Sequence, residues 1–311
     1  MLLVGAAVML SACSATKSGS SNAPGVTTTS SGVQVTTAFG TTPTVTVPSR
    51  SAPTALTQQA TTQGTGTVLA KGDTLIANYV GQTWTPKSGK PDVFDSSFSR
   101  GAPAAFVVGE GQIMPGWDSA LVGKNLGSRM VLTIPPADGY GSTGNASAGI
   151  TATDTLVFVI DLIADYKPGA AAPGTVVPNP PTTGLPTFTN VPGKQPTITS
   201  TAGVPVPAAL TSRLLVAGSG AKIDTTKTLV LELVQTDLAT ATKTQSTWAQ
   251  APQTIPAQNV FSVAADLTGQ NIGSRALVLA PATPEVPATS TTADQPAVPP
   301  TVLIIDVVGQ F

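Results

Sequence analysis

The alternation of polar and apolar residues begins near Val33 and predicts a chain dominated by β-strands. Residues 73–80 alternate with a period of two, which puts Leu75, Ala77 and Tyr79 on one face of a strand. Segments of similar character predict further strands at residues 44–47, 130–134 and 155–163.

A single segment, residues 116–127, has helical instead of strand periodicity. Its apolar residues Trp117, Ala120 and Leu121 recur at helical spacing, and glycines interrupt the pattern soon afterwards. A strand-rich chain with one short helix predicts an α+β fold, in which an antiparallel β half-barrel is wrapped on that helix.

Composition narrows the function more than it narrows the fold. Only 10% of the residues are charged, the net charge is −1, and no basic run is present, so nothing suggests a nucleic-acid partner. The chain has no His and a single Cys, which excludes an internal disulfide and leaves metal-dependent or triad-type catalysis poorly supported. We therefore expect no cofactor and no metal site.

Aromatic residues are scarce, yet they gather in one window between residues 94 and 140. This window contains no His, no Cys and no tight pair of carboxylates. Its aromatic residues, with two that flank it, are Tyr79, Phe94, Phe98, Phe106, Trp117, Tyr140 and Phe158. Such a set predicts a pocket that binds by shape and apolar contact and performs no covalent chemistry.

An ordered series of short motifs in this window resembles the FKBP-type peptidyl-prolyl cis-trans isomerases, the macrolide-binding immunophilins. The motifs are Phe94-Asp95-Ser96-Ser97, Phe106 before Val108-Gly109, Ile113-Met114-Pro115-Gly116-Trp117, and Ala137-Asp138-Gly139-Tyr140-Gly141. Order and spacing hold over about residues 66 to 166. The resemblance implies the same half-barrel fold, isomerase activity on proline-containing polypeptides, and macrolides as a further class of ligand.

The resemblance also implies roles for individual residues. Trp117 would form the floor under the proline ring, and Tyr140 would donate its hydroxyl to a substrate carbonyl, with Tyr79 and Asp95 as the other two catalytic residues. Arg100 would join Asp95 and Tyr79 at the rim, and Ile150 would close over the ligand from the loop that follows Tyr140. The remaining substrate-binding residues would be the walls Phe94, Phe106, Ile113, Met114 and Phe158.

Three positions depart from the family pattern. Ala104 replaces a wall aromatic, which predicts a slot that is shallower on one side. Asn145 stands where the family often has His, and residue 78 is Asn. These departures bear on rate and macrolide affinity more than on activity itself.

The first residues predict an export signal. Residues 1–13 form an apolar run too short to span a bilayer, and Leu10-Ser11-Ala12-Cys13 resembles the lipobox of bacterial lipoproteins, in which the Cys is acylated. The alternative is an ordinary signal peptide with a chance Cys. No basic residue precedes the run, which is consistent with a start codon upstream. We expect a lipid anchor at Cys13, a disordered tether at residues 14–35, and a location on the outer face of the cytoplasmic membrane, in the cell envelope of a bacterium.

The remainder of the chain predicts a second copy of the first domain. Residues 36–167 form the expected isomerase domain, residues 168–185 a Pro/Gly linker, and residues 186–311 a repeat. Motifs that recur in the same order support this, above all the run from Leu121 to Arg129, which returns from Leu267 to Arg275.

The second copy lacks the aromatic residues of the pocket. In this alignment Tyr79 becomes Leu233, Trp117 becomes Val263 and Phe158 becomes about Leu303. We therefore expect a degenerate repeat that keeps the fold without the activity, and one reading is that it only positions the first domain.

Taken together, the sequence predicts a membrane-tethered prolyl isomerase that assists the folding of exported proteins. The alternative is a non-catalytic binding or chaperone module for apolar or proline-rich chains on the same fold.

Overall fold

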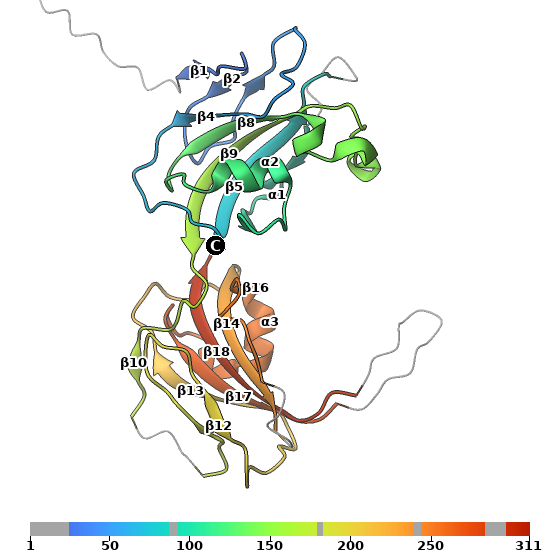
Figure 1. Ribbon diagram of the computed structural model, residues 1–311. Helices are drawn as coiled ribbons and strands as arrows, with labels where there is room; N and C mark the ends of the chain where they lie inside the picture. Colours follow the sequence, from blue (N-terminus) through green and yellow to red (C-terminus); the bar gives the residue numbers. More distant parts are fainter. Residues whose placement is uncertain (1–24, 87–92, 179–182, 239–243, 284–296) are drawn as a thin grey trace, which may run out of the picture.

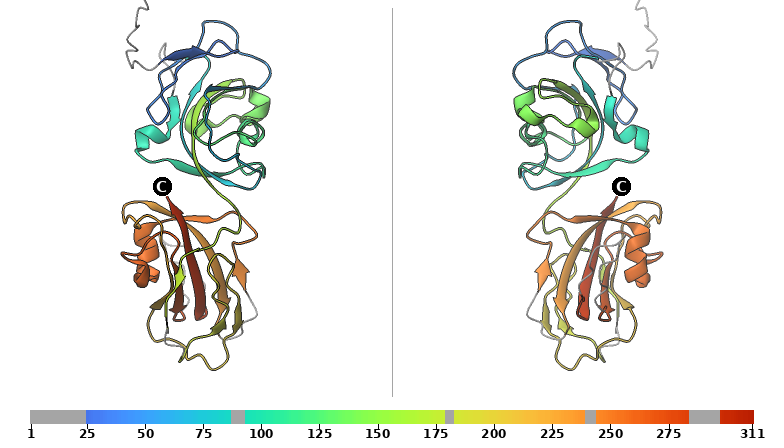
Figure 2. Two further views of the ribbon diagram at one scale, coloured as in Figure 1. Left: turned by 90° about the vertical axis from the view of Figure 1, so that its left-hand side faces the viewer. Right: turned by 90° about the vertical axis from the view of Figure 1, so that its right-hand side faces the viewer.

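The computed structural model describes residues 25–86, 93–178, 183–238, 244–283 and 297–311. The chain forms two β-rich halves, and the C-terminus lies between them (Figure 1). Two further views show the same end-to-end stacking of the halves (Figure 2). None of the helices in this described part combines the length and the apolar character needed to cross a membrane.

The first half is built on an antiparallel six-stranded sheet in the order β4-β8-β9-β5-β6, with β7 also paired to β5. Its strands are β4 (Thr57–Thr62), β5 (Thr74–Thr83), β6 (Val93–Ser96), β7 (Ala104–Val107), β8 (Arg129–Ile134) and β9 (Leu156–Tyr166). The helices are α1 (Ser97–Arg100), α2 (Pro115–Leu121) and three short 3-10 turns, η1 (Pro136–Asp138), η2 (Gly141–Thr143) and η3 (Ala146–Ala148). The α+β class and the half-barrel sheet predicted from the sequence are thus present here, with more helical turns than the single helix expected.

The main core of this half lies between α2 and one face of the sheet. Leu75, Ala77 and Tyr79 all belong to it, as the alternation along β5 predicts. Helix α2 contributes Trp117, Ala120 and Leu121, so its apolar stripe covers the sheet. This packing places α2 beside the window of aromatic residues.

The opposite face of the sheet is covered by a three-stranded ribbon formed by β1 (Val26–Thr28), β2 (Gln34–Thr36) and β3 (Val45–Thr46). Val33 and Val35 of the ribbon are fully buried. They pack in a cluster with Trp84 and the outward-facing valines of β8 and β9. The tether predicted for residues 14–35 is therefore wrong for residues 25–35, because these valines are needed to keep that face of the sheet from water. Residues 14–24 lie outside the described residues.

A buried ion pair fastens the ribbon to the sheet. The Arg129 guanidinium donates to both carboxylate oxygens of Asp161, at 2.6 and 2.7 Å, and both side chains are essentially inaccessible to solvent. Arg129 also donates to the carbonyls of Thr36 and Thr41, while the Gly40 amide donates to Asp161. The pair is thereby hydrogen-bonded on all sides, as a buried charge pair requires.

The second half is built on a seven-stranded antiparallel sheet in the order β10-β13-β17-β18-β14-β15, with β16 also paired to β14. Its strands are β10 (Thr175–Val176), β13 (Thr211–Ala217), β14 (Thr228–Asp237), β15 (Gln245–Ser246), β16 (Gln253–Pro256), β17 (Arg275–Ala280) and β18 (Thr301–Gln310). Helix α3 (Ala257–Val263) and the turn η4 (Ala265–Leu267) pack on one face. A ribbon of β11 (Thr187–Phe188) and β12 (Ile198–Ser200) covers the other face.

The linker predicted for residues 168–185 is largely part of the second half. Within it, β10 pairs with β13, and the buried Ala172 donates its amide to Asp306 at 2.7 Å. The part of the predicted linker that still connects the two halves is therefore short. Its Gly169 amide donates to Glu232, and the ring of Tyr166 lies against Gly309. These contacts hold the two halves against each other.

Candidate functional site

A pocket of about 210 Å³ lies in the first half, next to α2. Its lining is mostly aromatic and comes from β5, β6, β7, β9, α2, the loop before α2, and the segment between η1 and η2. The lining residues are Tyr79, Phe94, Asp95, Phe106, Ile113, Met114, Trp117, Tyr140 and Phe158. All of these are residues that the sequence singled out, and the fold brings them together from positions far apart in the chain.

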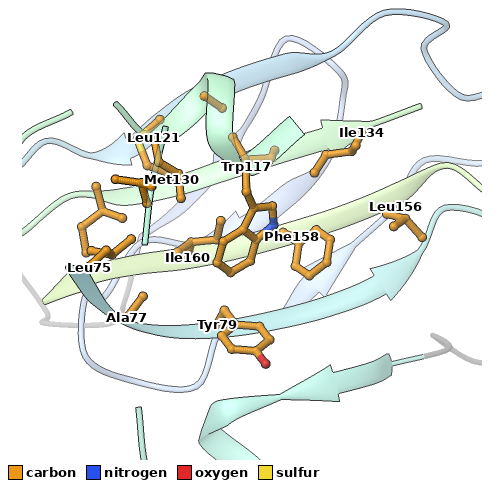
Figure 3. Packing of buried hydrophobic residues seen from close by; sticks show 14 of the residues in the cluster. Leu75, Ala77, Tyr79, Trp117, Leu121, Met130, Ile134, Leu156, Phe158 and Ile160 are labelled. Carbon is orange, nitrogen blue, oxygen red and sulfur yellow. The ribbon is translucent and has the colours of Figure 1, made fainter. Parts of the chain in front are cut away.

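Trp117 stands at the centre of the aromatic group (Figure 3). Its ring meets those of Tyr79 and Phe158 edge to face, with centroids 5.4 and 5.2 Å apart, and it tilts against Phe106 at 4.9 Å. Such edge-to-face pairs add to the stability given by burial alone. The indole is 4% exposed, and its N–H finds no partner among the described residues. The pocket floor is thus rigid and almost entirely apolar.

Local sequence explains how α2 presents Trp117. Pro115 occupies the first turn of the helix, where its missing N–H does no harm. Asp118, one residue after Trp117, accepts the backbone amides of Gly109 and Gly111 at 2.7 and 2.5 Å. This carboxylate fixes the loop that carries Ile113 and Met114. Sequence reasoning missed Asp118, although its place in the first turn of the helix marks it as an acceptor for nearby backbone amides.

At the rim, Tyr79, Asp95 and Arg100 form one hydrogen-bonded group. The Tyr79 hydroxyl donates to Asp95 at 2.5 Å and accepts from Arg100 at 2.8 Å, and Arg100 also pairs directly with Asp95. Burial, followed by the hydrogen bond to Asp95, raises the pKa of Tyr79 above its usual value. Hydrogen bonds to Tyr79 and then Asp95 raise the pKa of Arg100. The tyrosine therefore stays protonated and the arginine charged, and the hydrogen bonds hold the three side chains in a fixed arrangement at the rim.

Ser97 and Asn78 lie behind the rim, and neither was predicted as a residue of the site. The Tyr79 amide donates to the Ser97 hydroxyl at 2.8 Å, and that hydroxyl donates to the side-chain oxygen of Asn78 at 2.9 Å. These bonds tie β5 to the start of α1.

Gly81 is required on the same strand, because a Cβ there would lie 2.5 Å from the Phe158 ring and 2.9 Å from Phe94.

Ile150, in the loop after Tyr140, packs in the core beside the pocket. Ile150 is 4% exposed and belongs to the core cluster, and it does not line the pocket. The backbones of Ile150 and Asn145 pair with each other, and the Asn145 side chain accepts the Ala148 amide. The pairing holds Ile150 in the core cluster that also contains Trp117 and Phe158, and its closing over a ligand stays a prediction. Arg100 likewise lies at the rim through its contacts with Asp95 and Tyr79, outside the lining itself.

Tyr140 is half-buried at the pocket edge, and no described residue bonds to its hydroxyl. Ala104 pairs with Ala77 between β7 and β5 and packs against the core without lining the pocket. In the described part of the chain no group of three or more His, Cys, Asp or Glu side chains could hold a metal ion. Cys13 lies outside the described residues.

Sequence comparison with known proteins identifies one family. The family model of FKBP-type peptidyl-prolyl cis-trans isomerases matches residues 66–163. An "FK506-binding protein" of Streptomyces anulatus is 37% identical over 102 residues, which are 33% of this chain and 79% of that protein. The "Peptidyl-prolyl cis-trans isomerase FKBP15-1" of Arabidopsis thaliana is 42% identical over 94 residues, which are 30% of this chain and 58% of the relative. The solved crystal structure of AtFKBP13 is 33% identical and covers 37% of this chain and 95% of its own, with a TM-score of 0.32.

Proposed function

This chain belongs to the family of FKBP-type peptidyl-prolyl cis-trans isomerases, and from that premise we propose that it accelerates prolyl isomerisation in exported polypeptides. Residues 66–163 are its isomerase domain. The observation that carries the proposal is the pocket above Trp117, in which every wall residue implied by the family resemblance lines one cavity.

The chemistry follows from the amide bond. Resonance gives the X–Pro bond a rotation barrier of ~20 kcal/mol, although its cis and trans forms differ by only about 0.5–1 kcal/mol. In the twisted transition state conjugation is broken, and the carbonyl loses its charge-separated character. A site that binds this less polar state more tightly than either planar form lowers the barrier without a nucleophile.

The pocket has the features that this mechanism requires. Trp117, Phe106 and Phe158 provide an apolar floor and walls that would grip the proline ring and exclude water from the rotating amide. Tyr140 would donate its hydroxyl to a substrate carbonyl, and Asp95 with Tyr79 would hold the rim. The backbone amide of Ile113 would supply a further donor.

The substrates and the location are part of the same proposal. The Leu10-Ser11-Ala12-Cys13 motif supports acylation of Cys13 and tethering at the outer face of the cytoplasmic membrane of a bacterium, where newly exported chains fold. Relatives such as the Streptomyces protein are named for FK506 binding, and we propose that a macrolide also binds in the pocket of this chain.

We also propose that the second half is a degenerate FKBP-like repeat. Strands β13, β17, β18 and β14 follow one another in the sheet as β4, β8, β9 and β5 do. The buried pair of Arg129 with Asp161 has a counterpart in Arg275 with Asp306, at 2.5 and 2.8 Å. Leu233 pairs with Ile305 as Tyr79 pairs with Ile160.

One position of the repeat alignment needs correction. Val263, aligned with Trp117, lies at the end of α3 with 36% of its surface exposed, while Ala257 and Val260 face the core. The alignment fails here because Leu121 is the last residue of α2, whereas its counterpart Leu267 lies in η4, after α3 has ended at Val263.

The test is a protease-free isomerisation assay by exchange NMR on a short peptide with one X–Pro bond, using the whole protein. We expect acceleration, and a loss of about tenfold in kcat/KM for Tyr140→Phe, since one hydrogen bond contributes ~1.4 kcal/mol. Trp117→Ala should lose at least as much. The matched control is Tyr166→Phe, a tyrosine outside the pocket, which should retain full turnover.

Two outcomes would contradict the proposal. Wild-type rates in both pocket variants would show that the pocket does not carry the activity. Binding of the peptide, read from Trp117 fluorescence, without any acceleration would favour the non-catalytic module on the same fold.

A further inference from the structure

The second half has a cleft of about 550 Å³ at the place that corresponds to the rim of the aromatic pocket. The register of the sheets fixes this correspondence. Gln235 pairs with Gln245 between β14 and β15, as Gly81 pairs with Asp95 between β5 and β6. The Leu233 amide donates to the Thr247 hydroxyl at 2.8 Å, as the Tyr79 amide donates to Ser97.

The chemistry of this cleft differs from that of the pocket. Gln250 stands three residues after Thr247, as Arg100 stands three residues after Ser97. The rim group of Tyr79, Asp95 and Arg100 is therefore replaced by Leu233, Gln245 and Gln250. Among the described residues, no charged side chain lines the cleft; its lining is Leu233, Gln235, Thr244, Gln245, Ser246, Thr247, Gln250 and Gln253. We call it the amide cleft.

The four glutamines of the amide cleft are exposed. Within the described residues, their side-chain amides make no hydrogen bond to the rest of the protein. Each amide offers two N–H donors and one carbonyl acceptor. Four neutral groups that both donate and accept suit a ligand that presents both kinds of group and carries no required charge, which is the property of an extended polypeptide backbone.

A second cleft, of about 480 Å³, continues the amide cleft toward the isomerase domain. The two share Thr247, Gln250 and Gln253. At its far side the second cleft is lined by Val107 and Gln112, the chain neighbours of the pocket residues Phe106 and Ile113. A polar path therefore connects the second half to the two segments that form the pocket wall.

We propose that the amide cleft binds an extended segment of the same polypeptide whose X–Pro bond occupies the aromatic pocket. The inference rests on the proposed isomerase function and assigns the second half a role in substrate capture. The cleft binds the substrate chain equally tightly in the ground state and in the transition state. It therefore lowers KM for long substrates and leaves kcat unchanged.

The experiment compares two peptides with the whole protein. One is a short peptide with a single Leu-Pro bond. The other carries the same bond at the centre of an unstructured, uncharged chain of about twenty residues, which spans roughly 65 Å when extended. Exchange NMR at several peptide concentrations gives kcat and KM for both. We expect the KM of the long peptide to be lower by about tenfold, as tethered binding at a second site predicts.

The test variant is Gln245→Ala with Gln250→Ala, and the matched control is Gln258→Ala, an exposed glutamine on α3 outside the cleft. The double variant should raise the KM of the long peptide about tenfold while the short peptide is unaffected. The control should match the wild type for both peptides. The substituted side chains are exposed, so the fold should persist.

The outcomes separate this proposal from the one it rests on. If the wild type accelerates neither peptide, the isomerase function itself fails. If it accelerates the short peptide but has equal KM for both, or if the double variant leaves the long peptide unchanged, the amide cleft does not bind the substrate. Binding of a neutral oligosaccharide such as maltohexaose that the double variant abolishes, with no effect on the long peptide, would assign the cleft to glycans and overturn the proposal.

Discussion

At the scale of single residues, Glu232 is the most unusual ionisable group in the described chain. Glu232 is fully buried, and its carboxylate accepts hydrogen bonds from the Thr247 hydroxyl and, at 3.1 Å, from the backbone amide of Gly169. Asn78 occupies the corresponding place in the first half, where it accepts from Ser97. Burial raises the pKa of Glu232 from its usual 4.5 to about 7, and the nearby Asp306 adds to the rise. The second half thus holds a carboxyl group that changes charge near neutral pH.

This shift predicts a pH-dependent stability with a definite sign. Because the folded state binds the proton more tightly than the unfolded state, the stabilisation is complete below about pH 4.5 and is lost as the pH rises through 7. The loss is at most roughly 3 kcal/mol. Glu232→Gln, which imitates the protonated form, should exceed the wild type in stability by much less at pH 5 than at pH 8.

Hydrogen exchange of peptides from β14, followed by mass spectrometry at the two pH values, measures this effect in the second half alone. Glu110→Gln is the control, because Glu110 makes only an exposed pair with Lys71 at 3.8 Å. Equal pH dependence in the wild type and in Glu232→Gln would refute the assignment.

At the scale of elements, the ribbon β1–β3 is part of the isomerase half. Asp161 links β9 to the ribbon through Arg129 and through the Gly40 amide. Asp161→Asn would leave Arg129 buried without its counter-charge, and breaking such a pair is expected to destabilise by about 3–5 kcal/mol. We expect amides of residues 25–36 to lose their protection from hydrogen exchange.

The control is again Glu110→Gln, which removes the exposed ion pair with Lys71. This variant should change the free energy of unfolding by less than about 0.5 kcal/mol. An Asp161→Asn variant that keeps full protection in the ribbon would show that the valine cluster alone holds it in place.

The same elements show what the sequence could and could not predict. The walls of the pocket were predictable because long motifs such as Ile113 to Trp117 constrain both spacing and residue type. Strand β3 of the ribbon falls within the strand predicted at residues 44–47. Strands β1 and β2 were not predicted, because strands of three residues in a Ser/Thr-rich segment are too short for a period-two pattern to emerge. Val33 and Val35 alone did not distinguish a buried strand from a tether.

Other contacts also lie beyond what a local pattern can show. The role of Ile150 rests on the resemblance alone, and no pattern in the sequence reveals that its backbone pairs with Asn145. The linker was predicted from its prolines and glycines, while the bond from Ala172 to Asp306 depends on a residue more than a hundred positions away. Such long-range contacts leave no trace in local composition.

At the scale of the whole molecule, the contact between Tyr166 and Gly309 sets how the halves meet. A Cβ at Gly309 would lie 2.1 Å from the Tyr166 ring, so any larger residue there must move the ring or separate the halves. Tyr166 also hydrogen-bonds to the backbone of Gln310, and burial raises its pKa. Both contacts come from β18, so they hold the tyrosine against that strand.

Gly309→Ala should therefore separate the halves while each keeps its own core. Small-angle X-ray scattering should show a larger radius of gyration, and the further substitution Tyr166→Ala should restore the wild-type value by removing the clash. The second cleft depends on this arrangement, since its lining combines Gly72 and Val107 of the first half with Ala249 and Gln253 of the second. Gly309→Ala should consequently keep full turnover of a short prolyl peptide and lose the low KM for a long one. An unchanged scattering profile, or a long-peptide KM that survives a measured separation, would show that the two halves act independently on the polypeptide.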